Sequence, residues 1–185
     1  MINSINDYNT FLKNNQEDDL FLHIIFTDDK KHSCKSLPSI ILIQNIRTEE
    51  LYHLVIDHQD SPSIINLKQF IVDISKFHGR LFVLDKKSIL HHIPLGNKLL
   101  DINLGIHLNN EKFINVMEYE TEAHKFIRQN YYSYPFLNKV VPLVKHREMV
   151  SNIFLVIKKF IKHSIFNDNS YKRINNEIIE PLSKL

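Results

Sequence analysis

Residues 19–32, DLFLHIIFTDDKKH, run from a mostly apolar segment into acid. The length of the mostly apolar segment DLFLHIIF, residues 19–26, and its aromatic and β-branched side chains are typical of a buried β-strand. Asp28 and Asp29 follow just after that segment. Carboxylates at the end of a core strand could serve as the first ligands of a divalent-metal site. The stretch therefore predicts a central strand and raises the question of a metal site at its end.

The rest of the chain predicts a mixed α/β fold of one domain, residues 1–185. The expected elements are a helix over 4–15 with Asn or Asp available as its cap, strands over 39–46, 50–56 and 79–85, helices over 64–78, from Lys86 and after Asp101, and helices from about 120 onward. Three consecutive strands, a helix, a strand and then mostly helices indicate a mixed sheet with helices on its faces, in the ribonuclease-H-like manner.

Composition indicates a globular protein of a reducing compartment. Of the residues, 43% are hydrophobic and 24% are charged, and the net charge is +2, too close to neutral to indicate nucleic acid on charge alone. No apolar run approaches the ~18 residues of a membrane span, and MINSINDYNT at the start lacks the features of a secretory signal. Cys34 is the one cysteine of the sequence, which fits the cytosol best. The three glycines are far apart, which excludes a glycine-rich phosphate loop.

Several stretches together resemble one family. They are HIIFTDD at 23–29, PSIILIQNI at 38–46, LYHLVIDHQD at 51–60, RLFVLDKKSILHHI at 80–93, NKLLDINLGIHLNN at 97–110 and INNEIIEPLSKL at 174–185. Taken in order, they resemble the 3′–5′ exonuclease or exonuclease-like domain of bacterial DNA polymerase I, in polymerase family A. The last stretch is similar to the segment that leads into the polymerase domain, which implies a fragment ending at the start of that domain.

Active members of this family hydrolyse a phosphodiester with two divalent metals held by four carboxylates, an arrangement that suits magnesium or manganese. The resemblance puts Phe26 where the first-strand aspartate belongs and Asp28 where its glutamate belongs. A shift of one residue would use Thr27 and Asp29 instead. In LDKKSIL, the resemblance puts Ile89 at the next ligand position. A β-branched apolar side chain cannot replace a carboxylate there.

The third motif of the family, Tyr-x-x-x-Asp, also lacks its acid. Counting back from EPL without a gap puts His146 and Val150 at the two positions, and a one-residue gap gives Arg147 and Ser151. From 149 to 167 the sequence contains neither Asp nor Glu, so the conclusion does not depend on the register. Three of the four ligands are missing, and the resemblance therefore implies no catalytic residues and no metal ligands.

Other catalytic interpretations are weaker. Asp29, Asp85 and Asp101 together could rebuild a metal site, but a helix cap for Asp101 and a polar strand exit for Asp85 are the usual roles of such residues. Eleven histidines invite a zinc hypothesis, yet no pair has the spacing of ligands on one helix, and we expect most of them at the surface or at strand rims. Cys34 has no catalytic partner visible in the sequence.

Two features of the C-terminal third could contact DNA. Basic residues outnumber acidic ones over 138–173, and the candidate phosphate contacts are Lys145, Arg147, Lys158 and Lys162. The alternative is a solvated helix face, since Lys158 and Lys162 fall opposite the apolar stripe, and this is the interpretation that we favour. The aromatic cluster NYYSYPF at 130–136 could stack bases, or it could form a packed corner between helices.

The sequence thus predicts a catalytically inactive, vestigial exonuclease-like domain with a structural role in a replication or repair polymerase that lacks proofreading. The resemblance implies as partners the polymerase domain of the same chain and, through it, the primer-template. We expect a monomer in the bacterial cytoplasm, at the nucleoid, with no membrane association and no cofactor. The alternatives are an active nuclease with rearranged carboxylates, which would need Mg²⁺ or Mn²⁺, and a free-standing nucleic-acid-binding module.

Overall fold

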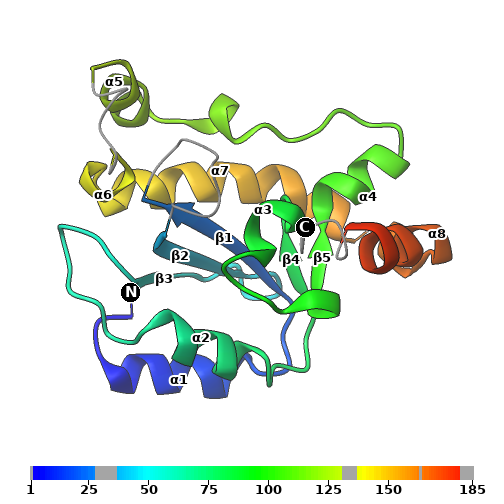
Figure 1. Cartoon of the computed structure of the whole chain (residues 1–185), viewed down its shortest axis with the longest axis horizontal. Coiled ribbons are helices and arrows are strands. Elements are labelled where there is room, and N and C mark those ends of the chain that lie inside the picture. The colour runs from blue at the N-terminus through cyan, green and yellow to red at the C-terminus, as the bar shows by residue number, and fades with distance from the viewer. Residues whose placement is uncertain (1, 28–36, 131–136, 163, 180–185) are drawn as a thin grey trace.

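The computed structural model describes residues 2–27, 37–130, 137–162 and 164–179. Its centre is a five-stranded mixed sheet with strand order β3-β2-β1-β4-β5 (Figure 1). The strands are β1 (Leu20–Phe26), β2 (Pro38–Asn45), β3 (Leu51–Val55), β4 (Leu81–Val83) and β5 (Leu99–Asp101). β2 is antiparallel to both β1 and β3, whereas β4 is parallel to both β1 and β5. The sheet therefore joins an antiparallel half to a parallel half through β1.

Helices cover both faces of this sheet (Figure 1). The α-helices are α1 (Ile5–Asn15), α2 (Leu67–Ile74), α3 (Lys86–Leu90), α4 (Ile102–Leu108), α5 (Glu122–Asn130), α6 (Leu137–Val140), α7 (Leu143–Ile161) and α8 (Asn169–Arg173). Four shorter helical segments are η1 (Gly96–Lys98), η2 (Val116–Tyr119), η3 (Ser164–Asn167) and η4 (Ile174–Ile179). No helix of the described residues is long and apolar enough to cross a membrane.

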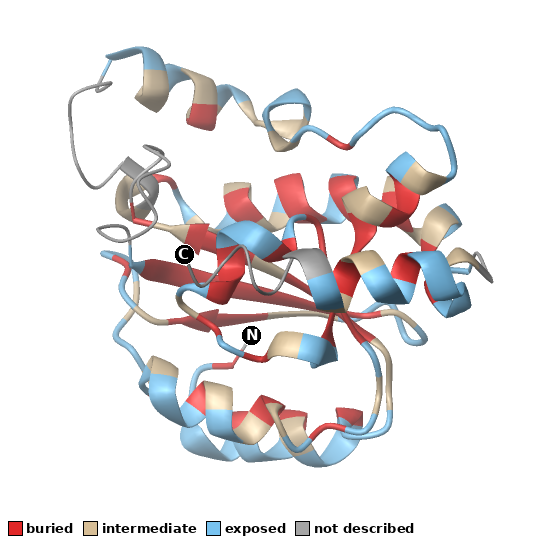
Figure 2. Cartoon of the chain, turned by 45° about the vertical axis from the view of Figure 1, so that its right-hand side comes forward, coloured by how far each residue is buried: buried red, intermediate tan, exposed pale blue. Residues whose placement is uncertain are grey.

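The sheet separates two hydrophobic cores, because alternate residues of each strand point to opposite faces. Leu22 and Ile41 lie on the face that α1 and α2 cover, whereas Phe21 and Leu42 lie on the face that α7 covers. Every residue of β2 is buried, as expected for a strand with a core on each side (Figure 2). α7 contributes Ile153, among other buried residues, to the second core.

The predicted elements largely match those of the structure, with four corrections. The predicted strand over 79–85 is shorter in the structure, where β4 covers only Leu81–Val83. The predicted helix over 64–78 begins only at Leu67, where Asn66 caps it, and ends at Ile74. The first helix is capped by Ser4, whose side chain accepts a hydrogen bond from the Asp7 backbone N–H at 3.1 Å, and not by Asn or Asp. Strand β5 was not predicted at all, because its three residues are too few to show a strand pattern.

Gly79 permits a close approach between the start of the parallel half and the end of α1. A Cβ atom at this position would lie 2.0 Å from the backbone oxygen of Asp18. Leu20 N–H in turn donates to the Arg80 carbonyl oxygen at 2.9 Å, and the Asp19 carboxylate pairs with the Arg80 guanidinium at 2.6 Å. A glycine is therefore required where the chain passes the end of α1 to enter β4 beside β1.

Candidate functional site

Phe26 is the last residue of β1 and packs against the core on the α1/α2 face. Its ring centroid lies 4.9 Å from that of His92, with an interplanar angle of 48°. The aromatic ring thus takes part in packing at the end of β1. Asp28 and Asp29, the acids next to it, lie outside the described residues, so the fate of the one retained acid position stays a prediction.

Ile89 lies on α3 and is buried in the same core as the residues around Phe26, with 6% of its surface exposed. The helix that carries it starts at the carboxyl end of β4, where the Asp85 side chain accepts a hydrogen bond from the Ser88 backbone N–H at 3.3 Å. The Ile89 side chain is therefore directed into apolar surroundings. An ionised carboxylate here would lose its hydration without a partner of opposite charge.

The two α7 positions are buried on the other side of the sheet. Val150 is fully buried in the α7-side core, and His146 is 1% exposed. In the alternative register, Arg147 is half-buried and Ser151 is exposed. The structure thus brings Phe26 and Ile89 into one core and Val150 into the opposite one, and the described residues show no single cluster of these positions.

Asp85 follows β4 and Asp101 is the last residue of the neighbouring parallel strand β5, and each caps the helix that comes next. Asp101 caps α4, as predicted: its Oδ1 accepts from the Leu104 backbone N–H at 2.9 Å, and its Oδ2 accepts from the Lys86 backbone N–H at 2.8 Å. Burial raises the pKa of the Asp101 carboxyl to about 6, although these two hydrogen bonds lower it in part. Asp85 caps α3, so its role as a polar strand exit is also confirmed.

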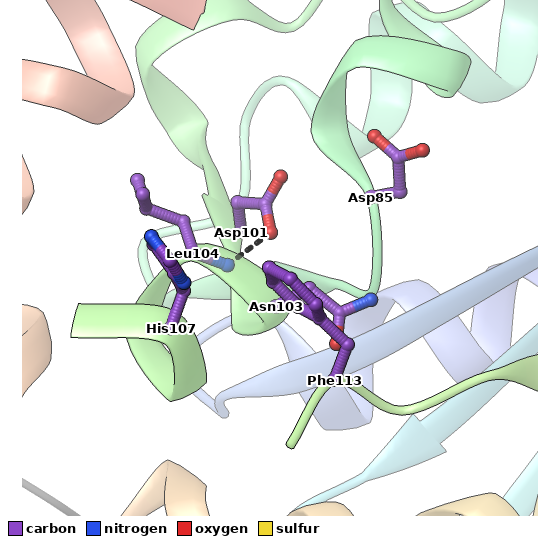
Figure 3. Close-up of a pocket in the computed structure, with 6 residues that line it drawn as sticks. All are labelled: Asp85, Asp101, Asn103, Leu104, His107 and Phe113. Carbon is purple, nitrogen blue, oxygen red and sulfur yellow. Dashed lines mark hydrogen bonds between the residues drawn. The ribbon is translucent and has the colours of Figure 1, made fainter. Parts of the chain in front are cut away.

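An open cavity of about 310 Å³ lies beside these two carboxylates. Its lining consists of Asp85, Asp101, Asn103, Leu104, His107 and Phe113 (Figure 3). The Phe113 ring stacks on the His107 ring at 5.3 Å and 14°. Within the described ranges, no three His, Cys, Asp or Glu side chains form a group that could hold a metal ion. The cavity offers two acids and an aromatic edge, and both Asp101 oxygens already accept backbone hydrogen bonds.

Two of the four candidate DNA contacts are engaged in ion pairs. Lys145 Nζ lies 2.8 Å from a Glu148 carboxylate oxygen one turn away, and Lys158 pairs with Glu49 in the β2–β3 turn. Arg147 is half-buried and Lys162 is exposed. Pairing with carboxylates is what the solvated-face interpretation expects of Lys145 and Lys158. DNA contact by these residues stays a prediction, and most of the aromatic cluster at 130–136 lies outside the described residues.

A group of buried histidines was missed by the sequence analysis, which expected most histidines at the surface or at strand rims. His53, His58, His124 and His146 are all buried. His53 and His23 stand opposite Leu42 in the sheet register, so these three side chains share the α7 face. The alternation along β1 and β3 could have revealed the two strand histidines, because it places both on a face that also carries apolar residues.

His53 is buried without hydrogen bonds from the described residues to its ring nitrogens. It is 1% exposed, and neither of its ring nitrogens has a hydrogen-bond partner within the described part of the chain. Burial, and secondarily the positive charge of Arg147, lowers the pKa of His53 to about 4. Burial likewise lowers the pKa of His23 to about 4. Both imidazoles are therefore neutral at pH 7.

We expect His53→Leu to raise the free energy of unfolding at pH 7 by about 1–3 kcal/mol, because it removes two unsatisfied polar atoms from a buried site. The folded pKa of about 4 lies below the unfolded value of about 6.5. His53 therefore costs the wild-type protein stability as the pH falls from about 6.5 toward 4, and the variant lacks that loss.

Urea unfolding followed by circular dichroism at pH 7 and at pH 5 measures both effects. The free energy of unfolding should change between pH 7 and pH 5 by about 2 kcal/mol less in His53→Leu than in the wild-type protein. His91→Leu, at an exposed position just after α3, is the control and should leave that difference unchanged. A His53→Leu protein that is less stable than wild type at pH 7 would contradict the expectation.

Comparisons with known proteins leave the family undetermined. No protein-family model matches the sequence, and a search of curated proteins returned no significant match.

Proposed function

We propose that this chain is a degenerate 3′–5′ exonuclease-like domain of a family A DNA polymerase, without nuclease activity and with an architectural role. The observation that carries the proposal is the apolar character of the ligand positions given by the resemblance. Phe26 packs on one core, Ile89 is buried in it, and Val150 is buried in the other. Hydrophobic side chains in these places contribute packing and offer no oxygen to a hard cation.

The sheet supports the same proposal. Its order β3-β2-β1-β4-β5, with one antiparallel half, one parallel half and helices on both faces, is compatible with a ribonuclease-H-like fold. In such an arrangement the carboxyl ends of β1 and β4 point to the same edge of the sheet, since these two strands are parallel neighbours. Phe26 ends β1 and α3 follows β4, and the ring contact between Phe26 and His92 supports placing both positions at one site.

The C-terminal elements support an architectural role. Asn175, in η4, donates from its side-chain amide to the Leu99 carbonyl oxygen at 3.2 Å and accepts from the Asp101 N–H at 3.4 Å. The buried Lys86 ammonium donates to the Asn175 carbonyl oxygen at 2.9 Å. These contacts fix η4 to the edge of the sheet. A domain that follows η4 would be attached to a rigid base.

The proposal is tested by incubating the purified chain, at high concentration, with 5′-labelled single strands and primer-templates in Mg²⁺ or Mn²⁺. The expected result is no shortening of the 3′ end beyond that in a protein-free control. Metal-dependent shortening that Asp28→Ala abolishes would overturn the proposal. The architectural part predicts that the coding sequence continues past residue 185 into polymerase motifs, and a stop codon there would contradict it.

One observation favours the active alternative. Asp85 and Asp101 border one cavity at the ends of two parallel strands, which is where rearranged carboxylates would meet a cation. If this alternative holds, the wild-type chain degrades DNA in the presence of metal and Asp101→Asn does not. Our proposal instead predicts that neither protein degrades DNA.

A further inference from the structure

Helix α5 is attached to the rest of the protein through a pair of histidines. Of the nine residues of α5, all of them described, only His124 is buried. Its Nε2 lies 3.0 Å from Nδ1 of the buried His146 on α7, and the two ring centroids are 4.8 Å apart at 65°. In both views, α5 lies on the far side of α7 from the sheet (Figures 1 and 2). Among the described residues, this pair is thus a buried contact between α5 and α7.

The neighbouring hydrogen bonds fix the tautomers of both rings. The Thr121 backbone N–H points at His124 Nδ1 over 3.2 Å, and only an unprotonated nitrogen can accept from it. A neutral His124 therefore carries its proton on Nε2 and donates it to His146 Nδ1. His146 in turn is unprotonated at Nδ1 and carries its own proton on Nε2.

His124 also stabilises the first turn of α5. Its backbone N–H donates to Thr121 Oγ1 at 3.4 Å, while its side chain accepts from the Thr121 backbone N–H. This is the reciprocal pattern of a capping box, with histidine at the position usually taken by glutamate or glutamine. Unlike glutamine, histidine loses its acceptor when it is protonated. One neutral imidazole thus maintains both the start of α5 and its contact with α7.

Two further histidines lie close to this pair, His23 on β1 and His58 after β3, and His58 Nδ1 lies 3.9 Å from an Asp60 carboxylate oxygen. Arg147 is the next residue of α7, and the Glu120–Arg128 ion pair belongs to the segment that carries α5. His23 is close enough for the positive charge of His124 to lower its pKa further. The His58 ring meets the His146 ring edge-on at 6.1 Å and donates from Nε2 to the Val141 carbonyl oxygen at 2.9 Å. Histidines thus predominate around the pair.

We propose that protonation of the His124–His146 pair releases α5 from α7, so that the pair acts as an acid-sensitive latch. A proton on His146 Nδ1 faces the His124 Nε2–H donor, so two donors oppose each other and the hydrogen bond between the helices is lost. A proton on His124 Nδ1 can be accepted by the Thr121 hydroxyl oxygen, 2.7 Å away, but it removes the acceptor of the Thr121 backbone N–H. Release uncovers the part of α7 around His146. The latch is independent of the proposed function.

Hydrogen exchange of the whole chain tests the latch, with rates corrected for the intrinsic effect of pH and with EDTA present. Between pH 7.5 and pH 5.5, the amides of 122–130 should lose protection by about tenfold, which corresponds to the loss of one hydrogen bond worth about 1.4 kcal/mol. The amides of α2, residues 67–74, should keep theirs, because α2 lies on the opposite face. Equal loss in both helices would show global unfolding and would overturn the proposal.

His124→Gln separates titration from packing, because glutamine can accept from Thr121 and donate to His146 without titrating. In this variant, α5 should stay protected at both pH values, whereas the exposed-site control His91→Gln should behave like wild type. A His124→Gln protein that still loses protection at pH 5.5 would overturn the proposal. In case this variant does not fold, ¹⁵N chemical shifts of the wild-type imidazoles give a second criterion. Loss of protection must follow the titration of His124 or His146.

Discussion

Replacement of Ile89 by aspartate is expected to lower the free energy of unfolding at pH 7 by about 3–5 kcal/mol, the usual cost of leaving a charge buried without a partner. Ile89 is 6% exposed and packs in the α1/α2-side core, so the new carboxylate would replace apolar contacts as well as lose its hydration. The loss relative to wild type should shrink toward pH 4, because protonation makes the carboxyl neutral. Chemical denaturation at several pH values measures both effects.

Ser88→Asp provides a matched control for this prediction. It introduces the same charge one residue earlier on α3, at an exposed position near the helix N-terminus, and should change stability by less than about 0.5 kcal/mol. Mn²⁺ should stabilise neither variant. If Ile89→Asp is as stable as Ser88→Asp, then apolar burial at position 89 contributes nothing, and the observation that carries the proposed function fails. Restoration of its stability by Mn²⁺ would show that other metal ligands are still present around position 89, and would contradict the loss of the site.

The central part of the fold follows from local sequence patterns. β1 and β2 are segments of strand length made mostly of apolar residues, and a sheet whose central strands have a core on each side requires such segments. β5 does not follow from a pattern, because its residues Leu99–Asp101 form a strand only through their pairing with β4. The predicted helix over 64–78 was too long because a local pattern continued beyond the element. The apolar residues at 64 and 65 keep helical spacing, but Asn66 caps the helix, which begins at Leu67.

The chemistry of the candidate site could be predicted from the sequence only where it depends on the type of a single residue. That Ile89 cannot ligate a metal is clear from its side chain, whereas its burial required the structure. The contact of His124 with His146 could not be predicted, since the two residues are on different helices and nothing in either local sequence specifies their approach. The same holds for Lys86 and Asn175, which are 89 residues apart. Pairings of this kind depend on the path of the chain between the elements.

Asn175→Leu is expected to lower the free energy of unfolding by about 3 kcal/mol, because it leaves buried backbone groups of β5 without partners, each at a cost of about 1–3 kcal/mol. The wild-type amide is 1% exposed and bonds to the Leu99 carbonyl oxygen and the Asp101 N–H, as a sixth strand would. Leucine has a similar size but neither donor nor acceptor.

Asn9→Leu, on the exposed side of α1, is the control for general effects of replacing asparagine by leucine, and should change stability by less than about 0.5 kcal/mol. Urea denaturation compares the two variants, and hydrogen exchange at the Asp101 amide reports the edge directly. That amide should exchange faster in Asn175→Leu even where the protein remains folded, because its acceptor is gone. An unchanged Asp101 amide, or a loss of stability below about 1 kcal/mol, would mean that Asn175 does not close the edge of the sheet. The rigid attachment of η4 would then lack its main support.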